Sequence, residues 1–236
     1  MKIETLIRQN LAIVYDRDQV ADPSRKLFTD KHWLEANRVL DSAPGRGAAL
    51  FLETPFGPAV LRHYRRGGWA ARFSEDRYFY TGYRRSRPFR EFSLLARLFE
   101  HDLPVPQPLA AQCTRQGIWY RGALLTRTIP DVSPLADCLS AGVGDDAWAR
   151  IGACVACFHA AGAFHADLNA RNVLLQDEGE SVYLVDFDRG KFNPGRPVDG
   201  RGNLERLRRS LEKLWPETPS RQLSDCWTRL MEGYRG

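Results

Sequence analysis

The first half of the chain contains short apolar runs separated by turn residues. Residues 48–53 (AALFLE) and 59–64 (AVLRHY) lie on either side of the turn-like segment TPFGP. Two runs of this length around a Pro/Gly turn predict a β-hairpin, which the chain enters through a glycine-rich corner at 45–47. A further run at 118–129 predicts a strand that Gly122 interrupts.

Other stretches repeat their apolar residues at helical spacing. Residues 87–101 do so with a proline near the first turn, which predicts a helix. Glu91 lies on the apolar face of this helix, where a carboxylate needs a partner. Residues 145–162 predict a second helix, with an acidic start, a glycine stop and one apolar face formed by Trp148, Ile151, Val155 and Phe158.

The order of the remaining patterns indicates the architecture. Two short strands and then two helices follow, near 172–175, 182–187, 200–214 and 221–233. Strands and one helix come first and mostly helices come later, which predicts an α+β fold with a strand-rich N-terminal lobe and a short helical C-terminal lobe. We expect a single domain with an N-lobe at about 1–128, a hinge at about 124–130 and a C-lobe at about 131–236.

Polar residues with distinctive spacing occur in the C-terminal half, in HADLNARNVLL and VYLVDFD. Asp167 and Asn172 are five residues apart in a polar loop, and Asp186 ends an apolar strand nineteen residues after Asp167. This spacing resembles the protein-kinase-like catalytic loop, H-x-D followed by Asn, and the metal-binding D-F-x. Phosphoryl transfer needs one carboxylate to orient the acceptor hydroxyl and oxygen ligands for Mg²⁺ on the nucleotide phosphates. We therefore predict a two-lobed, protein-kinase-like fold in which Asp167 is the catalytic base and Asn172 and Asp186 hold Mg²⁺ on ATP.

Residues expected to bind the nucleotide lie upstream. Gly45 and Gly47 form the corner before a strand, where the backbone can approach phosphate. Val60 and Arg62 point to one face of the next strand, so we expect Val60 to contact adenine and Arg62 to reach the phosphates or Glu91. Glu91 on the inner helix face then has an ion-pair partner; the alternative is an ordinary exposed carboxylate.

Arg62 stands where a protein kinase carries its strand lysine. A planar guanidinium is not equivalent to an ammonium, so Arg65 or Arg66 is the alternative for this role. Leu125 and Arg127 belong to the predicted hinge, whose backbone is expected to meet adenine.

Charge is concentrated in one region. The formal net charge is +5, and nine arginines lie between residues 62 and 90. An anionic partner such as phosphate or anionic lipid fits this excess, and a solvated arginine-rich surface is the alternative. No nucleic-acid-binding motif accompanies the charge, so nucleic acid is not expected.

The compartment is predicted from two absences. There is no run of about eighteen apolar residues, and the start MKIETLIRQN lacks the apolar core of a signal peptide. Five cysteines, an odd number, suggest reduced thiols. We expect a cytosolic chain that can lie on a membrane surface.

Two departures from protein kinases concern regulation and substrate. Ala166 replaces the arginine that in protein kinases commonly binds the phosphate of a phosphorylated activation loop. Asp188 replaces the glycine of D-F-G. Only a short segment, RGKFNPGRPVDG, separates Asp188 from the next helical pattern, and no A-P-E follows. A platform for a protein substrate is therefore not expected.

Four segments together resemble the bacterial 3-deoxy-D-manno-octulosonic acid (Kdo) kinases, relatives of the heptose kinases of the lipopolysaccharide core. They are VLRHYRRGG, REFSLLARLFEHDLPVPQP, FHADLNARNVLL and VYLVDFDRG, and the resemblance covers roughly residues 40 to 214. It implies ATP-dependent phosphorylation of the 4-hydroxyl of Kdo on a Kdo-lipid A precursor, with Asp167 in the active site. It also implies a peripheral position on the anionic cytoplasmic face of the inner membrane. No protein partner is predicted.

Two other functions stay open. A kinase of the same fold could act on heptose, an aminoglycoside or a protein, and acceptor profiling separates these. A pseudokinase could serve as a binding module, and the substitutions at Arg62 and Asp188 leave room for it. The presence of Asp167, Asn172 and Asp186 favours an enzyme.

Overall fold

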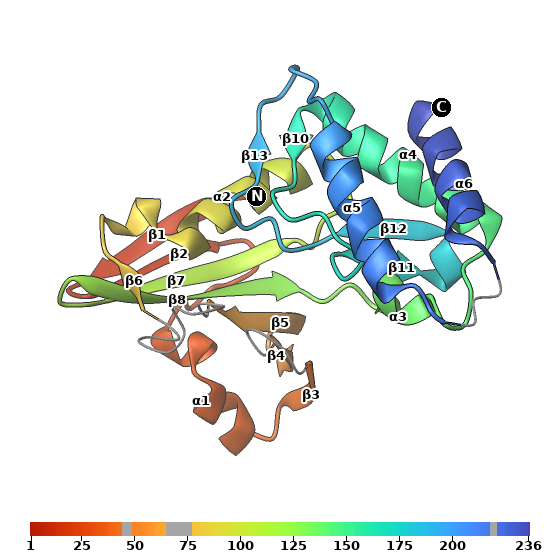
Figure 1. Ribbon diagram of the computed structural model, residues 1–236. Coiled ribbons are helices and arrows are strands. Elements are labelled where there is room, and N and C mark those ends of the chain that lie inside the picture. The colour runs from red at the N-terminus through yellow and green to blue at the C-terminus, as the bar shows by residue number, and fades with distance from the viewer. Residues whose placement is uncertain (44–48, 65–76, 218–220) are drawn as a thin grey trace. The chain divides into compact units, whose positions relative to one another are not determined.

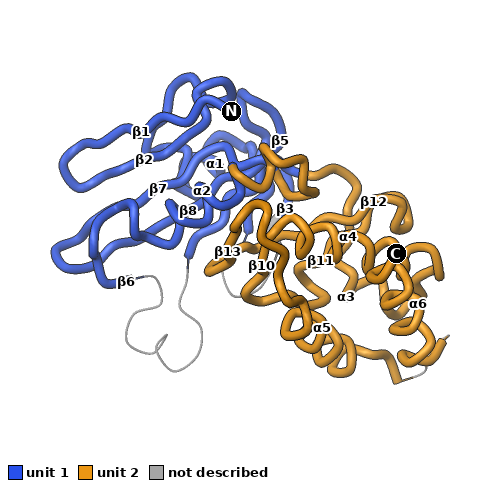
Figure 2. Tube along the Cα trace, turned by 90° about the horizontal axis from the view of Figure 1, so that it is seen from above, with its two compact units in different colours: residues 1–96, 107–128 blue, residues 97–106, 129–236 orange. Residues whose placement is uncertain are grey.

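A computed structural model describes residues 1–43, 49–64, 77–217 and 221–236 (Figure 1). The chain divides into two compact units (Figure 2). Unit 1 comprises Met1–Ala96 and Gln107–Thr128, and unit 2 comprises Arg97–Pro106 and Ile129–Gly236. The predicted single domain with its lobes and hinge stays a prediction, and the units differ from those lobes in that residues 97–106 belong to unit 2.

Unit 1 is built on an antiparallel sheet. Among the described residues, the strands lie in the order β1-β2-β7-β8-β5-β4-β3, and β6 pairs with β8. Their bounds are β1 (Ile3–Arg8), β2 (Leu11–Asp16), β3 (Val39–Ala43), β4 (Ala49–Thr54), β5 (Gly57–His63), β6 (Tyr78–Phe79), β7 (Pro108–Gln116) and β8 (Trp119–Arg127). The antiparallel pairing of β4 with β5 confirms the predicted hairpin, and β8 confirms the predicted strand at 118–129.

One face of this sheet carries an apolar core. The short helices η1 (Arg25–Phe28) and α1 (Asp30–Glu35) supply Phe28 and Trp33 to it, where they join Leu61 and Leu125 of the sheet. Trp33 Nε1 donates to the Leu27 carbonyl oxygen at 3.0 Å, so the buried indole N–H is satisfied. The first forty residues mix short apolar pieces with charge, so the sequence predicts no element there, yet they contribute to the core of unit 1.

The predicted helix at 87–101 is present as α2 (Arg87–Phe99), which follows the short η3 (Tyr83–Arg85). Its residues Phe92 and Leu95 are fully buried. The Gly122 interruption of β8 has a steric reason, because a Cβ there would lie 2.6 Å from Cγ of Pro88 in the first turn of α2. Only glycine lets the strand and the helix approach so closely.

Unit 2 contains most of the helices and two small sheets. The sheets have the strand orders β12-β11-β9 and β10-β13 among the described residues. The bounds are β9 (Val132–Pro134), α3 (Leu135–Cys138), α4 (Asp145–Ala161), β10 (Ala163–Phe164), β11 (Val173–Gln176), η4 (Asp177–Gly179), β12 (Ser181–Leu184), β13 (Lys191–Phe192), α5 (Arg201–Leu214) and α6 (Leu223–Arg235). In α4, the four residues of the predicted apolar face are all buried, which confirms that pattern.

Helices α4 and α6 pack through glycines. A Cβ on Gly152 of α4 would lie 1.9 Å from the carbonyl oxygen of Leu230, and one on Gly233 of α6 would lie 1.9 Å from that of Ala149. Each glycine therefore admits the backbone of the other helix. No helix among the described residues is long and apolar enough to span a bilayer.

We expect Gly152→Ala to lower the free energy of unfolding by about 1 to 3 kcal/mol, because the added methyl group must push the backbone of α6 away. Gly202→Ala is the matched control, since a Cβ on Gly202 in α5 would meet nothing within 4 Å. That variant should be as stable as the parent or slightly more stable. Urea unfolding followed by circular dichroism measures both. Equal stability of the two variants would contradict the close approach of α4 and α6.

Candidate active site

The loop between β10 and β11 presents Asp167 to solvent on a buried base. Asp167 is exposed, whereas the flanking His165, Leu168 and Ala170 are buried. The buried side chains on either side of Asp167 fix the backbone of the loop. The carboxylate of Asp167 is therefore held toward solvent. An exposed carboxylate on a fixed backbone suits contact with a ligand.

His165 lies beneath this loop. Its Nε2 lies 2.8 Å from the Val185 carbonyl oxygen, and its Nδ1 accepts from the Asp167 backbone N–H at 3.1 Å. Because Nδ1 is an acceptor, the ring is neutral with its proton on Nε2. Burial lowers the pKa of His165 below its usual value, which stabilises that neutral form. The sequence-based interpretation of His165 as a packing and hydrogen-bonding residue is confirmed.

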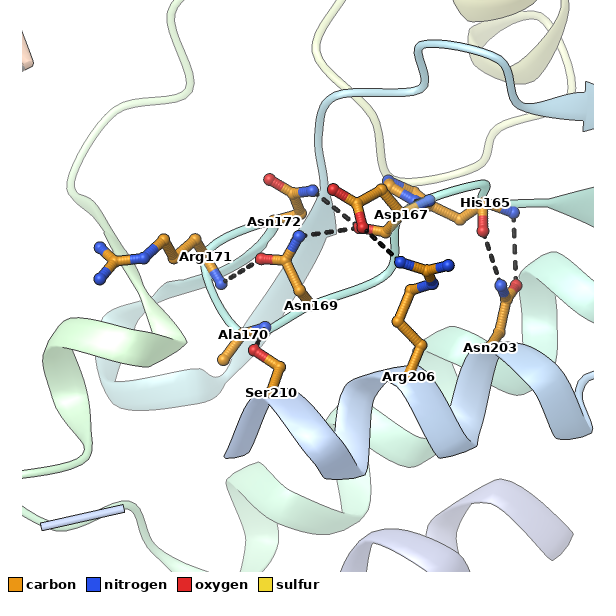
Figure 3. Close-up of polar contacts among 9 residues, drawn as sticks. All are labelled: His165, Asp167, Asn169, Ala170, Arg171, Asn172, Asn203, Arg206 and Ser210. Atoms are coloured by element: carbon orange, nitrogen blue, oxygen red, sulfur yellow. Dashed lines mark hydrogen bonds and ion pairs between the residues drawn. The ribbon is translucent and has the colours of Figure 1, made fainter. Parts of the chain in front are cut away.

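Helix α5 supports the loop through three polar residues at spacings of three and four (Figure 3). Asn203 Nδ2 donates to the His165 carbonyl oxygen at 2.6 Å, and its Oδ1 accepts from the His165 N–H at 3.3 Å. Arg206 Nη1 donates to Asp167 Oδ1 at 3.0 Å. Ser210 Oγ accepts from the Ala170 N–H at 3.1 Å. One face of α5 therefore sets the position of the whole loop.

The hairpin of β11 and β12 brings Asn172 and Asp186 to the same end. Val173, the first residue of β11, pairs with Leu184, the last residue of β12. The segments that carry Asn172, just before β11, and Asp186, just after β12, therefore lie at the same end of the hairpin. The Val185 N–H donates to the Asn172 carbonyl oxygen at 3.0 Å, which ties the two segments together. Asn172 Nδ2 donates to the Asp167 carbonyl oxygen at 2.9 Å, so the three predicted residues of unit 2 lie in one place.

Asp186 is followed by a strong anchor. Phe187 is 1% exposed, stacks on Phe158 with ring centroids 5.5 Å apart, and contacts the ring of His165 at 4.6 Å. Asp186 itself is only half-buried and has a φ of 62°, a left-handed backbone that Asp adopts more readily than most residues. The buried phenylalanine thus fixes a turn that leaves the preceding carboxylate accessible.

The donor atoms at this end of the hairpin fit a hard divalent cation. The amide nitrogen of Asn172 is occupied by Asp167, and its Oδ1 has no hydrogen-bond partner within the described part of the chain. An amide oxygen and a carboxylate, supplied here by two neighbouring segments, are oxygen ligands of the kind that Mg²⁺ or Ca²⁺ prefers. The described residues contain no group of three or more His, Cys, Asp or Glu suited to a metal, so these two residues would share the ion with other oxygen donors.

In unit 1 the predicted ion pair between Arg62 and Glu91 is present. Glu91 is 2% exposed, and its Oε1 accepts from Arg62 Nη2 at 2.5 Å. Its other oxygen, Oε2, accepts from the Tyr64 hydroxyl, a partner that the sequence did not suggest. Both oxygens of a buried carboxylate are thus satisfied. A part for this pair in nucleotide binding stays a prediction.

The other residues predicted to bind nucleotide are placed differently from one another. Val60 and Arg62 share one face of β5 and are half-buried, whereas Leu125 is fully buried in the core on the opposite face. Arg127 binds the Phe56 carbonyl oxygen and the Gln19 side chain, and its backbone N–H donates to Gln107. Their contacts with adenine stay predictions. Gly45 and Gly47, and the alternatives Arg65 and Arg66, lie outside the described residues.

A family model described as the lipopolysaccharide kinase (Kdo/WaaP) family matches residues 30–234. The chain belongs to this family. A 3-deoxy-D-manno-octulosonic acid kinase of Stenotrophomonas maltophilia (strain R551-3) is 43% identical over 224 residues, which cover 94% of this chain and 89% of that protein. One of Xanthomonas euvesicatoria pv. vesicatoria (strain 85-10) is 42% identical over 223 residues, with the same coverage. The predicted family and the predicted class of enzyme, a kinase, are confirmed.

Two solved structures resemble the fold. One is WaaP in complex with acyl carrier protein, with a TM-score of 0.54 and 15% identity, covering 91% of this chain and 86% of that one. The other is the amicoumacin kinase hAmiN in complex with AMP-PNP, Ca²⁺ and Ami, with a TM-score of 0.59 and 11% identity, covering 89% and 77%. The predicted α+β, kinase-like fold is confirmed. The structure of WaaP contains a protein partner, so it gives no support to the expectation of none for this chain, and that expectation stays untested.

The sequence-based predictions missed the residues of α5 that hold the loop. Arg206 lies 39 residues after Asp167, and Asn203 lies 38 residues after His165. Arg171, a cation nearer to Asp167 along the chain, points away from the carboxylate of Asp167 (Figure 3). The sequence did contain a signal for Asn203, because this polar residue lies on the apolar stripe of an amphipathic helix, four residues before Leu207. In the structure Asn203 is 1% exposed.

Burial of two histidines predicts a pH-dependent stability. Burial lowers the pKa values of both His159 and His165 below 6.5, the usual value that they regain on unfolding. Below that pH the unfolded chain binds protons that the folded chain does not, so stability should fall as the pH is lowered from about 7.5 to about 5.5. The slope should not exceed about 1.4 kcal/mol per pH unit for each histidine.

Urea unfolding at a series of pH values tests this. His159→Gln should reduce the slope between about pH 6.5 and about pH 5.5, because one of the two proton-binding groups is gone. A free energy of unfolding that stays constant or increases as the pH is lowered would contradict neutral, buried histidines.

Proposed function

We propose that this chain transfers the γ-phosphoryl group of ATP to the 4-hydroxyl of the Kdo residue on a Kdo-lipid A precursor. The observation that carries the proposal is the exposed Asp167 carboxylate, on a loop that buried side chains hold in place close to Asn172 and to the segment of Asp186. The curated relatives named above are Kdo kinases of similar length, which supports the choice of acceptor.

Asp167 acts as the catalytic base. The acceptor oxygen forms a bond to the γ-phosphorus, the bond from this phosphorus to the oxygen bridging it to the β-phosphate breaks, and the hydroxyl proton passes to the Asp167 carboxylate. The loop supplies positioning, because Asp167 is tied through its backbone to His165, Asn169 and Asn172. Positioning and charge stabilisation account for most of the catalysis of phosphoryl transfer.

Asn172 and Asp186 are the ligands of Mg²⁺. The ion, when bound, supplies positive charge to the phosphate oxygens of ATP. The chain contributes the amide oxygen of Asn172 and the carboxylate of Asp186, and the Phe187 anchor keeps the latter in place.

Unit 1 contributes to nucleotide binding through Arg62, whose guanidinium is oriented by the buried Glu91. The side chain of Arg62 is 25% exposed, so part of it stays accessible to an anionic ligand while it binds Glu91. Val60 on the same strand face contacts adenine together with the backbone of Leu125 and Arg127, and Gly45 and Gly47 approach the phosphates.

The acceptor and its location agree with the charge of the chain. A Kdo-lipid A precursor carries a sugar carboxylate and phosphates, and a net charge of +5 favours an anionic surface. Exposed arginines at 84, 85 and 90 belong to the arginine-rich stretch around η3 and α2. The chain would therefore work as a peripheral protein on the cytoplasmic face of the inner membrane.

The decisive experiment is mass spectrometry of a Kdo-lipid A precursor after incubation with purified protein and Mg·ATP. We expect a gain of one phosphate, located on the 4-hydroxyl of Kdo by fragmentation or by nuclear magnetic resonance. Asp167→Asn should lower turnover by at least about a hundredfold, because the proton acceptor is lost, while ATP binding is largely spared. Asp177→Asn is the control, since it makes the same substitution at an exposed position in η4 and should be fully active.

Equal loss of ATP binding and turnover in Asp167→Asn would contradict its role as base. An unmodified Kdo precursor together with a phosphorylated heptose acceptor would reject the substrate and retain the class of enzyme. Absence of turnover on any sugar acceptor, with ATP still bound, would instead favour the binding-module alternative.

The buried ion pair makes a separate prediction for the nucleotide. Glu91→Gln keeps the shape of the side chain but removes its charge, so Arg62 loses the partner that orients it. We expect kcat/KM for ATP to fall by about tenfold or more, because a buried charge pair is broken. Glu100→Gln, at an exposed site just after α2, is the matched control and should change kcat/KM little. An unchanged kcat/KM in Glu91→Gln would exclude the pair from nucleotide binding.

A further inference from the structure

The predicted base of the active site has an arginine as its direct partner. Arg206 Nη1 lies 3.0 Å from Asp167 Oδ1. The side chain of Arg206 is 48% exposed and that of Asp167 is 61% exposed, so a ligand can reach both. An exposed ion pair of this kind contributes little to stability and rearranges easily when a ligand arrives.

The guanidinium of Arg206 is only partly used. It carries five N–H donors, and its contact with Asp167 engages one terminal nitrogen. Among the residues that the structure describes, Arg206 has no other hydrogen-bond or ion-pair partner. The remaining edge can therefore take a second anion while the first contact is kept, as a planar guanidinium does with carboxylates and phosphates.

The backbone beneath Arg206 is fixed on both sides. Asn203, one turn earlier on α5, is buried and binds both the N–H and the carbonyl oxygen of His165, and Ser210, one turn later, binds the Ala170 N–H (Figure 3). The loop thus meets α5 at points before and after Arg206. The backbone of Arg206 is therefore placed beside the loop by contacts other than its ion pair with Asp167.

We propose that Arg206 binds the carboxylate of the acceptor sugar and so selects an acidic sugar over a neutral one. The inference rests on the proposed function, because it assumes that Asp167 meets the sugar hydroxyl. The chemistry of the acceptor agrees with it. In a 3-deoxy-2-ulosonic acid the carboxylate is attached to ring carbon 2, and carbon 3, which lacks a hydroxyl, separates it from the 4-hydroxyl.

The distances match this arrangement. A base accepts a proton from a hydroxyl at about 3 Å, so a hydroxyl bound to Asp167 Oδ1 lies within about 6 Å of Arg206 Nη1. Substituents on ring carbons 2 and 4 are related across one carbon and fall within the same range. One acceptor can therefore place its 4-hydroxyl on Asp167 and its carboxylate on Arg206 at once.

Crossing two variants with two acceptors tests the proposal. One acceptor is the Kdo-lipid A precursor, and the other is the same compound with the Kdo carboxylate converted to a neutral carboxamide. We expect the parent enzyme to prefer the acid, and Arg206→Gln to lower kcat/KM for the acid by about tenfold to a hundredfold, the value of a charge-assisted contact. The same variant should change kcat/KM for the carboxamide little, so the preference disappears.

Three further measurements separate binding from a structural effect. Arg206→Lys should recover part of the preference for the acid, because it restores charge without the planar fork. Arg209→Gln, at an exposed arginine on the same helix, should leave both acceptors unaffected. The equilibrium affinity for the acid without ATP, measured by calorimetry, should fall in Arg206→Gln but not in Arg209→Gln.

Two results would overturn the proposal while the proposed function stands. If Arg206→Gln lowers kcat/KM equally for both acceptors, Arg206 only orients Asp167. If the parent enzyme phosphorylates acid and carboxamide alike, the carboxylate is not recognised. Failure of the parent enzyme to phosphorylate either compound would instead reject the proposed function and this inference with it.

Discussion

The position of Asp167 depends on one buried amide. Asn203 is 1% exposed, and its Oδ1 accepts both from the His165 N–H and from His159 Nε2, while its Nδ2 donates to the His165 carbonyl oxygen. Removal of this amide would leave the buried N–H and carbonyl groups of His165 without these partners, which costs more than an average hydrogen bond contributes. The loop is thus held in one register against α5. That register places Arg206 beside the carboxylate of Asp167 and Ser210 beside the Ala170 backbone.

The same physical rule governs unit 1 through a charge. A buried carboxylate is tolerated only when both oxygens have partners, and Glu91 has Arg62 on one and the Tyr64 hydroxyl on the other. This double contact ties α2 to the end of β5. It also suits arginine at position 62, because a planar guanidinium holds a carboxylate in a fixed geometry, which a single ammonium point charge does less well.

Local spacing explains why the closeness of the segments of Asn172 and Asp186 could be predicted from sequence. Asn172 and Asp186 flank a short antiparallel hairpin, so pairing of its strands brings them together whatever the rest of the fold does. Arg206 has no such local link to Asp167, since their contact depends on how α5 packs 39 residues later. The helix carries several arginines, and periodicity alone does not say which one faces the loop.

The strands within the first forty residues could not be predicted from the sequence for a different reason. Strand β1 lies at the edge of the sheet and buries little, while β2 beside it is buried at almost every position. In neither sequence, IETLIR or LAIVYD, do apolar and polar residues alternate strictly, which is the pattern that identifies a half-buried strand. β1 and β2 pair as a local hairpin, and β2 also pairs with β7, about a hundred residues further along the chain. The contact of β2 with β7 and the placement of Arg206 both depend on residues that are distant in sequence, which a local pattern does not predict.

The arginine–carboxylate pairs of the candidate site, Arg62 with Glu91 and Arg206 with Asp167, differ in a way that indicates different uses. The pair of Arg62 with Glu91 is nearly removed from solvent on the carboxylate side, and each oxygen of Glu91 is already bound. Such a pair holds a position, because exchanging its partners would expose a buried charge. In the pair of Arg206 with Asp167, both side chains are about half exposed. Their contact uses one nitrogen of Arg206 and one oxygen of Asp167, so further N–H donors and the second carboxylate oxygen are available to a ligand. Because water already competes for those groups, an anionic sugar can replace the water at little cost, which makes the exposed pair the one suited to recognising an acceptor.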